Sequence, residues 1–515
     1  MIIELANVFL TIFVIALLMC LMSGFPVAFV LGGVSLLMAG LGALFGVFDT
    51  SFLIAMPQRI YAAMNNDILL AVPLFVFMGA MLDRSGIATE LLDGIGRLFG
   101  KRRGGLGYAV TLVGALLAAS TGIVGATVTT MALLSLPIML KWGYSKRLAS
   151  GSICAAGTLG QIIPPSLVLV LLADTISAAY QKSQLEQGVF SPDTVSISDL
   201  FAGAIVPGFI LVLAYLTYQI ILATLNPNVS PAPPDDEEID EISKRDLSMR
   251  LVPPLTLIIG VLGSILGGVA TPTESASIGA VGAILLAGFG TERRGMANAG
   301  LLLLGAAVLL KLGISDLGLS LFMERALVAV PMLGFLVLLL AALRSLLASG
   351  NLDRTCVETA CLSAMVFMIL IGAAMLSLVF RGFGGEETVH HLIESVPGGP
   401  MTALAMVMLV MLVLGFILDF IEVIFVIVPT VAPVLLLSGI DPIWLAILIS
   451  LNLQTSFLTP PFGFALFYFR SSAPPEISTR DIYVGVLPFI AIQLLVLGLV
   501  AFFPDISTWL PYALR

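Results

Sequence analysis

Two long apolar stretches each contain a pair of adjacent prolines, in Ile162-Ile-Pro-Pro-Ser166 and in Leu458-Thr-Pro-Pro-Phe-Gly463. A proline inside a helix removes a backbone hydrogen bond and clashes with the preceding turn, so each stretch is predicted to be a broken helix. A shift of 296 residues (460 minus 164) moves the first proline pair onto the second. The same shift places Pro137 on Pro433 and Gly143 on Gly439. Helices broken at corresponding places in the two halves of a membrane protein point to a transporter's binding site.

The composition is that of a helical protein embedded in a membrane. Of the 515 residues, 59% are hydrophobic and 11% are charged, and the mean hydropathy is +1.11. Soluble proteins carry about 25% charged residues. Apolar runs of about 20 residues, long enough to cross a bilayer, recur along the chain. The four cysteines have no CxxC spacing, so neither a disulfide framework nor a zinc site is expected. The sequence has no P-loop motif, which argues against nucleotide hydrolysis.

The apolar runs predict an all-α polytopic fold of about 12 transmembrane helices with two re-entrant hairpins. The hairpins are expected at 108–140 and 401–437, with interruptions at 120–125 and 415–422. Basic residues flank the first hairpin on both sides, whereas few lie near the second. The positive-inside rule therefore makes the two hairpins enter from opposite faces and places both chain termini outside. Opposite entry is what an inverted repeat requires.

On this basis we divide the chain into five parts. Residues 1–107 are expected to form N-terminal scaffold helices, and 108–180 the first hairpin with its broken helix. Residues 181–400 are expected to form further scaffold helices. Residues 401–472 would hold the second hairpin with its broken helix, and 473–515 the C-terminal helix. The two hairpins and the two broken helices would together form a transport domain.

The hairpin tips and helix breaks are the candidate binding sites. A break frees backbone carbonyls, which suit Na⁺ together with Ser and Thr hydroxyls, and helix N-termini attract anionic groups. The first candidate sodium site comprises Thr121 and Gly122 at the tip with Gly160, Ile163 and Pro165 at the break. The second comprises Gly415 and Asp419 at the tip with Ser456, Thr459 and Pro461 at the break. Five residues are expected near the substrate, namely Ser120, Thr158, Pro164, Ser166 and Pro460.

These motifs also have structural interpretations. The proline pairs could be ordinary kinks, which are common in membrane helices. Asp419 and Glu422 lie deep in an apolar segment, where an ionised carboxylate costs on the order of 2.5–3.5 kcal/mol. Asp419 could coordinate a cation, cap a helix at the second tip, or do both. Glu422 could be structural or could stay protonated. The motif Thr271-Pro-Thr-Glu274 is expected to start a helix, with Thr271 as its cap.

Several motifs resemble the large membrane subunit of the tripartite ATP-independent periplasmic (TRAP) transporters, the DctM-like family. They are Pro73-Leu-Phe-Val-Phe-Met-Gly79 through Arg84-Ser-Gly-Ile-Ala88, Ile162-Ile-Pro-Pro-Ser166, Thr271-Pro-Thr-Glu274, Gly415-Phe-Ile-Leu-Asp419 and Leu458-Thr-Pro-Pro-Phe-Gly463. The motifs occur in family order and cover nearly the whole chain.

This resemblance implies a sodium-coupled elevator transporter of the bacterial inner membrane. Its partners would be a small four-helix membrane subunit and a periplasmic substrate-binding protein that delivers an organic acid. By the same resemblance, the tip and break residues fall where the family holds its sodium ions. The chain departs from the family pattern in two places. Ile123 stands where many members have a serine, and 299–343 looks like an insertion of two helices.

Two other functions remain open from the sequence. A stand-alone Na⁺/carboxylate symporter or Na⁺/H⁺ antiporter of similar inverted-repeat build would work without a binding protein. An intramembrane enzyme would use Asp419 and Glu422 as paired carboxylates, but it would leave the twofold repeat unexplained. We therefore expect a transporter with Na⁺ as its coupling ion, with no catalytic residue and no other cofactor.

Overall fold

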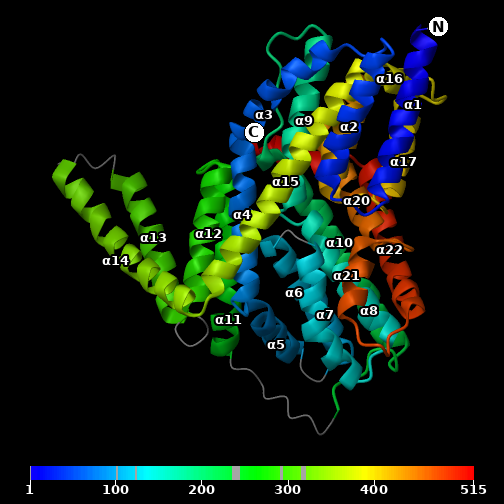
Figure 1. The fold of residues 1–515 in the computed structure, drawn as a ribbon. Helices are drawn as coiled ribbons and strands as arrows, with labels where there is room; N and C mark the ends of the chain where they lie inside the picture. Colours follow the sequence, from blue (N-terminus) through cyan, green and yellow to red (C-terminus); the bar gives the residue numbers. More distant parts are fainter. Residues whose placement is uncertain (1, 100–101, 122–123, 235–243, 290–293, 315–320) are drawn as a thin grey trace.

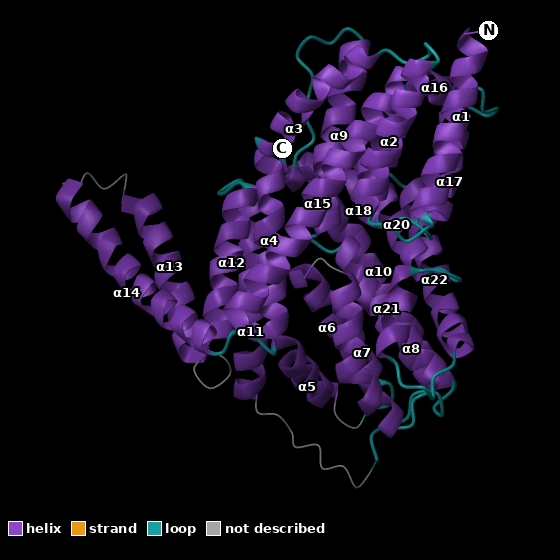
Figure 2. Cartoon of the chain, in the orientation of Figure 1, coloured by secondary structure: helices purple, strands orange, loops and turns teal. Residues whose placement is uncertain are grey.

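The computed structural model describes residues 2–99, 102–121, 124–234, 244–289, 294–314 and 321–515. Throughout these residues the secondary structure is helical, and no strand occurs among them (Figure 2). The predicted all-α class is therefore confirmed. Eight of the described helices are long and apolar enough to cross a membrane, or nine if the bent pair Thr50–Met64 and Ile68–Arg84 forms one span. Shorter apolar helices of 10–17 residues accompany them, and the expected number of about 12 spans stays a prediction.

One group of helices forms a frame around the broken helices. Its members are η1 (Thr50–Ala55), α1 (Ile2–Leu21), α2 (Val27–Leu44), α3 (Met56–Met64), α4 (Asp67–Arg84), α5 (Ile87–Phe99), α11 (Lys244–Leu266), α12 (Pro272–Phe289), α15 (Asn351–Gly382) and α16 (Gly385–Glu394). Within the frame, α4 packs extensively on α12 and α15, and α15 packs on α2. Helix α12 starts as predicted, because Thr271 Oγ1 accepts from the Glu274 backbone N–H at 3.3 Å and the Thr271 backbone N–H donates to Glu274 Oε2 at 2.8 Å.

The expected insertion forms two helices, α13 (Arg294–Ile314) and α14 (Leu321–Ala348). They pack on each other and on α12, and they project away from the rest of the molecule (Figure 1). The 20-residue apolar part of α14 is only 22% buried, the smallest share among the eight candidate spans of the described residues.

The segments expected to form the two hairpins and the two broken helices each consist of several helices, while the re-entrant course of the hairpins stays a prediction. The first set consists of α6 (Gly105–Thr121) and α7 (Val124–Lys141), followed by α8 (Lys146–Thr158), the short η2 (Leu159–Gln161) and α9 (Leu167–Glu186). The second consists of α17 (Pro400–Leu414), α18 (Phe420–Glu422), the π-helical η3 (Val423–Ile427) and α19 (Val428–Leu437), followed by α20 (Pro442–Leu458) and α21 (Phe464–Ser472). Gly143 and Gly439 make the turn between hairpin and broken helix with φ of 79° and 84°, a conformation that favours glycine.

The two sets pack into each other. Helix α7 of the first hairpin lies against α21 of the second broken helix, and α19 of the second hairpin lies against α9 of the first. Helix α20 also contacts η2, the point at which the first helix breaks. Each hairpin therefore covers the other copy's broken helix, and the two breaks lie in one shared core.

The repeat continues beyond the broken helices into α10 (Ile197–Leu225) and α22 (Thr479–Phe502). Each begins with a reciprocal capping box, Ser196 with Asp199 and Ser478 with Asp481, which satisfies backbone N–H groups at the helix start. Arg515 pairs with Asp199 through contacts of 3.0 and 2.7 Å, and Arg147 pairs with Asp481 at 3.5 Å. Helix α22 packs closely on α8, and α10 packs on α9 and α20.

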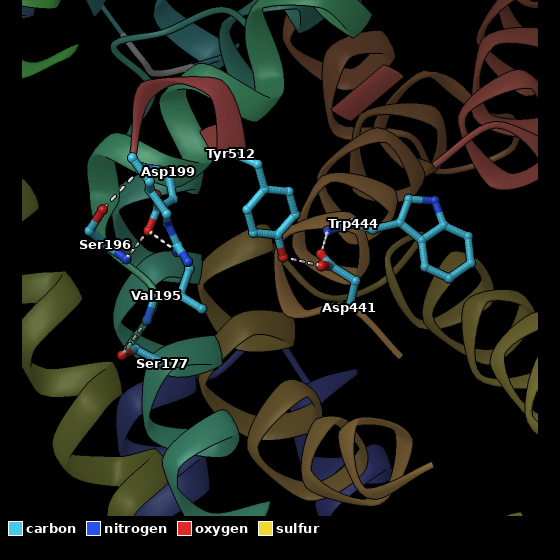
Figure 3. Close-up of polar contacts among 8 residues, drawn as sticks. Ser177, Val195, Ser196, Asp199, Asp441, Trp444 and Tyr512 are labelled. Atoms are coloured by element: carbon cyan, nitrogen blue, oxygen red, sulfur yellow. Dashed lines mark hydrogen bonds and ion pairs between the residues drawn. The ribbon is translucent and has the colours of Figure 1, made fainter. Parts of the chain in front are cut away.

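The C-terminal helix α23 (Asp505–Leu514) packs on α10 and is bonded to the start of α20 (Figure 3). The Tyr512 hydroxyl donates to Asp441 Oδ2 at 2.5 Å, and the Trp444 backbone N–H donates to Asp441 Oδ1 at 2.8 Å. Helix α23 therefore connects the start of α20 to the start of α10.

Candidate functional site

The chain leaves the helical conformation at 162–166 in the first copy and at 459–463 in the second. The Pro164-Pro165 and Pro460-Pro461 peptide bonds are both cis. The surroundings of the two breaks differ. Pro164, Pro165 and Ser166 are buried, whereas Pro461 is exposed and the side chain of Phe462 is 62% exposed. Only the second break is therefore open at the surface.

Two serine hydroxyls form hydrogen bonds with the backbone carbonyl that the first break leaves free. Ser166 Oγ donates to the Gln161 carbonyl at 3.0 Å, and Ser450 Oγ of α20 donates to the same carbonyl at 2.9 Å. Thr158 Oγ1 donates to the Ala155 carbonyl at 2.9 Å and accepts from Gln493 Nε2 at 3.4 Å. The helix break thus frees a carbonyl as predicted, and the second repeat supplies one of the hydroxyls that satisfy it.

The predicted residues of the second break also lie together. Thr459 Oγ1 donates to the Thr455 carbonyl at 2.7 Å, and Ser456 Oγ donates to the Leu453 carbonyl at 2.8 Å. Tyr483 donates its hydroxyl to the Pro461 carbonyl at 2.7 Å. A hydroxyl that donates its proton keeps lone pairs that can accept a donor or bind a cation. This break therefore offers oxygen atoms of the kind that a hard cation requires.

The second hairpin tip touches the second break. A Cβ atom built on Gly415 would collide with the Ser456 side chain, so glycine allows the close approach. Asp419 caps the following helix, because its Oδ1 accepts from the Phe420 backbone N–H at 2.8 Å. Glu422 Oε2 in turn accepts from the Asp419 backbone N–H at 3.2 Å. Asp419 therefore caps a helix, which was its structural interpretation, and Glu422 completes a capping box that was not predicted; cation binding by Asp419 stays a prediction.

The first hairpin tip is only partly described. Ser120 and Thr121 are the last residues of α6, and Gly122 and Ile123 lie outside the described residues. Helix α6 packs on η2 and therefore approaches the first break, where Gly160 is buried and Ile163 is half-buried. The break residues of the first predicted sodium site therefore lie next to α6, the helix that carries the tip.

Two glutamines that the sequence analysis did not single out lie in this core. Gln161 ends η2 and Gln454 lies in α20, and both side chains are 0% exposed. No described residue forms a hydrogen bond with either side-chain amide. Gln454 follows Ser450 by one helical turn, so it is on the face of α20 that meets the first break. A polar side chain inside an apolar run is the sequence signal that could have found them.

An internal repeat in which two broken helices pack into one core is typical of polytopic helical transporters. The chain belongs to the family described as the tripartite ATP-independent periplasmic transporter, DctM component, which it matches over residues 14–312 and 307–506. The two matched segments overlap at residues 307–312, within α13.

Curated relatives agree with this membership. The C4-dicarboxylate TRAP transporter large permease protein DctM of Vibrio cholerae is 28% identical over 438 residues, which cover 85% of this chain and 84% of the relative. The isethionate TRAP transporter permease protein DctMQ of Oleidesulfovibrio alaskensis is 24% identical and covers 84% of this chain, which spans 56% of that relative. The sialic acid permease SiaT of Haemophilus influenzae is 22% identical, with coverage of 85% and 58%.

The fold is also similar to that of a solved transporter. The crystal structure of YdaH from Alcanivorax borkumensis superimposes with a TM-score of 0.54 at 15% identity. The match covers 89% of this chain and 88% of the YdaH chain. At this identity the likeness concerns the fold alone.

Proposed function

We propose that this chain is the large permease subunit of a sodium-coupled transporter that imports an organic anion. The observation that carries the proposal is the contact of the second hairpin tip with the second break, where Gly415 meets Ser456 and Asp419 lies four residues further on. The tip carries the Asp419 carboxylate and the helix before the break carries the Ser456 hydroxyl, so both sides of this contact supply oxygen atoms of the kind that a hard cation requires.

Sodium would occupy the two predicted sites. At the second, the ligands would be the Asp419 carboxylate, the Ser456 and Thr459 hydroxyls and the carbonyls of Gly415 and Pro461. At the first, the ligands would come from Thr121, Gly122, Gly160, Ile163 and Pro165. The substrate would lie between the tips and the breaks, near Ser120, Thr158, Pro164, Ser166 and Pro460, and the amides of Gln161 and Gln454 would add polar groups to that region.

The names of the relatives suggest the substrate class. A C4-dicarboxylate, isethionate and sialic acid all carry a carboxylate or sulfonate group. We infer that the solute moved by this chain is an organic acid in its anionic form. A periplasmic binding protein would deliver it, and a small four-helix membrane subunit would complete the transporter in the bacterial inner membrane, with the N-terminus periplasmic.

The moving part in this proposal consists of α6–α10 and α17–α22, which pack as one core, and the frame stays fixed. Two side-chain contacts cross from the frame to the moving part at one end of the molecule. Asn66 Nδ2 donates to Asp174 Oδ1 at 2.7 Å, and Lys182 Nζ donates to Glu386 Oε2 at 3.0 Å. An elevator movement of the core would separate both pairs in every transport cycle.

Uptake of labelled organic acids into proteoliposomes tests the function. The vesicles would hold this chain with its small subunit, with and without an inward Na⁺ gradient and the cognate binding protein. Uptake that needs both supports the proposal. Sodium-driven uptake without the binding protein would instead identify a stand-alone symporter, and no uptake by a folded complex would refute transport of this kind.

Crosslinking tests the elevator movement separately. In a variant without native cysteines, Lys182→Cys and Glu386→Cys would be joined by a flexible bis-maleimide. We expect the crosslink to abolish uptake. The matched control joins Arg84→Cys to Glu358→Cys, which replaces a 2.6 Å pair between α4 and α15 inside the frame. Uptake that survives the first crosslink would rule out a movement of α9 past α16.

A further inference from the structure

A crevice separates the second hairpin from the frame. Its inner part has a volume of about 400 Å³ and lies between α1, α2 and α15 on one side and α17, η3 and α19 on the other. The lining is almost wholly apolar, with Phe13, Leu31, Leu376, Val410 and Val431 among its residues. Glu422 also lines it, but one of its carboxylate oxygens accepts from the Asp419 backbone N–H.

A second, charged pocket of about 300 Å³ continues this crevice towards the end of the molecule at which α16 lies (Figure 1). Thr430 lines both pockets. The two pockets are also adjacent at two other points. Phe380 and Val389 line the apolar pocket, and the residues that follow them in sequence, Arg381 and His390, line the charged pocket. The two pockets therefore form one amphipathic crevice with an apolar interior and a charged mouth.

The dimensions of the apolar part match one leaflet of a bilayer. On the hairpin side it extends from Glu422 to Thr430, which is about 12 Å at 1.5 Å per helical residue. Half of the hydrocarbon core of a bilayer is about 15 Å thick. The exposed side chains of Val14 on α1 and Val410 on α17, 40% and 48% accessible, line the crevice on the lipid-facing side.

The charges at the mouth match a zwitterionic headgroup. Lys182 and Arg381 both approach Glu386 Oε2, at 3.0 and 3.7 Å, so these two cations share one carboxylate. A phosphodiester would give the two cations a second anionic partner. Glu186 and Glu387 line the same mouth and offer carboxylates to an ammonium group.

We propose that this crevice binds one phospholipid with a phosphate and an ammonium in its headgroup, of the phosphatidylethanolamine type. An acyl chain would fill the apolar part between hairpin and frame, and the phosphate would meet Lys182 and Arg381. The lipid would seal the boundary at which the second hairpin meets the frame. This inference concerns binding alone and does not depend on the transport function.

Lipid retention on purification tests the proposal. The complex would be purified in mild detergent from membranes containing phosphatidylethanolamine and phosphatidylglycerol, and the lipids bound per chain would be counted by native mass spectrometry. We expect about one phosphatidylethanolamine per chain in the wild type. Val410→Trp on the hairpin wall and Ser377→Phe on the frame wall should each lower retention at least threefold.

Matched controls separate this site from lipid bound elsewhere. Val413 lies on the same helix, is 49% exposed and does not line the crevice, so Val413→Trp should retain the lipid. Lys182→Gln should lower retention, whereas Arg480→Gln, near the opposite end of the molecule, should not. Equal retention in Val410→Trp and Val413→Trp, or no retained lipid in the wild type, would overturn the proposal. Preferential retention of phosphatidylglycerol would overturn the headgroup assignment.

Discussion

Replacing Asp419 by asparagine and by alanine separates its two roles at the second hairpin tip. Asparagine keeps a side-chain oxygen that can accept from the Phe420 backbone N–H, now 2.8 Å from Oδ1, but it carries no charge. Alanine removes both the cap and the charge. We therefore expect Asp419→Asn to leave the fold intact and to impair sodium binding. Asp419→Ala should impair sodium binding and also lower the stability of the fold.

The magnitudes follow from the contacts. Asparagine and aspartate are about equally good caps, whereas replacing either by alanine costs about 1 kcal/mol. Loss of a charged oxygen ligand costs roughly 1.5–3 kcal/mol, and each 1.4 kcal/mol corresponds to about a factor of ten in affinity. Asp419→Asn should therefore raise the sodium concentration for half-maximal uptake by about 10-fold to 100-fold. Its melting temperature should match that of the wild type.

The assay is sodium-dependent uptake into proteoliposomes, combined with thermal unfolding of the purified complex. Glu422→Gln is the matched control, because a glutamine oxygen can still accept from the Asp419 backbone N–H. We expect it to change the sodium dependence less than threefold. A wild-type sodium dependence in Asp419→Asn would refute the carboxylate as a sodium ligand. An unchanged melting temperature in Asp419→Ala would refute the cap as a stabilising contact.

Three further predictions concern the same core. Gly415→Ala should lower stability by about 1–3 kcal/mol through its collision with Ser456, whereas Gly40→Ala, which meets nothing within 4 Å, should not lower the melting temperature. Gln161→Leu and Gln454→Leu should each reduce uptake at least tenfold. Neither change should lower the melting temperature, because neither side-chain amide has a hydrogen bond to lose. The control Gln219→Leu loses a 2.6 Å bond to Thr111 and should lower the melting temperature. Asp199 raises the pKa of Arg515. The loss of stability caused by Arg515→Ala should therefore be constant from pH 6 to 9 and should vanish only as the pH rises through that raised pKa. A stability difference between wild type and Arg515→Ala that shrinks between pH 6 and 9 would contradict this.

The sequence predicted the helix breaks well because each has a local cause. Two adjacent prolines in an apolar run interrupt a helix wherever they occur, and the observed breaks at 162–166 and 459–463 contain both pairs. The interruption of the second hairpin was also predicted, since Gly415 and Asp419 end one helix and cap the next. These features depend on a few neighbouring residues, and the sequence displays those directly.

Contacts between the repeats were harder to predict. Nothing local indicates that Ser450 donates to the Gln161 carbonyl, because that bond joins residues of different repeats through the packing of α20 on η2. The same holds for the crevice, whose walls come from helices far apart in the chain. Such features arise from the relative placement of helices, which periodicity and spacing do not determine.

The internal repeat itself shows which parts of the chain the core constrains. Pro164 and Pro460 differ by 296 residues, whereas the cap residues Ser196 and Ser478 differ by 282 (478 minus 196). Most of the 14-residue difference lies in the helix after the break, because α9 has 20 residues and α21 has 9, and the connection that follows is also longer in the first copy. Asp199 and Asp481 keep the 282-residue shift of the cap serines, and each pairs with an arginine from another part of the chain. The length after the break therefore varies between the copies, while the starts of α10 and α22 are held by contacts with distant parts of the chain. The unit that was duplicated therefore consists of hairpin, broken helix and capped helix together, and we expect all three to move as one body.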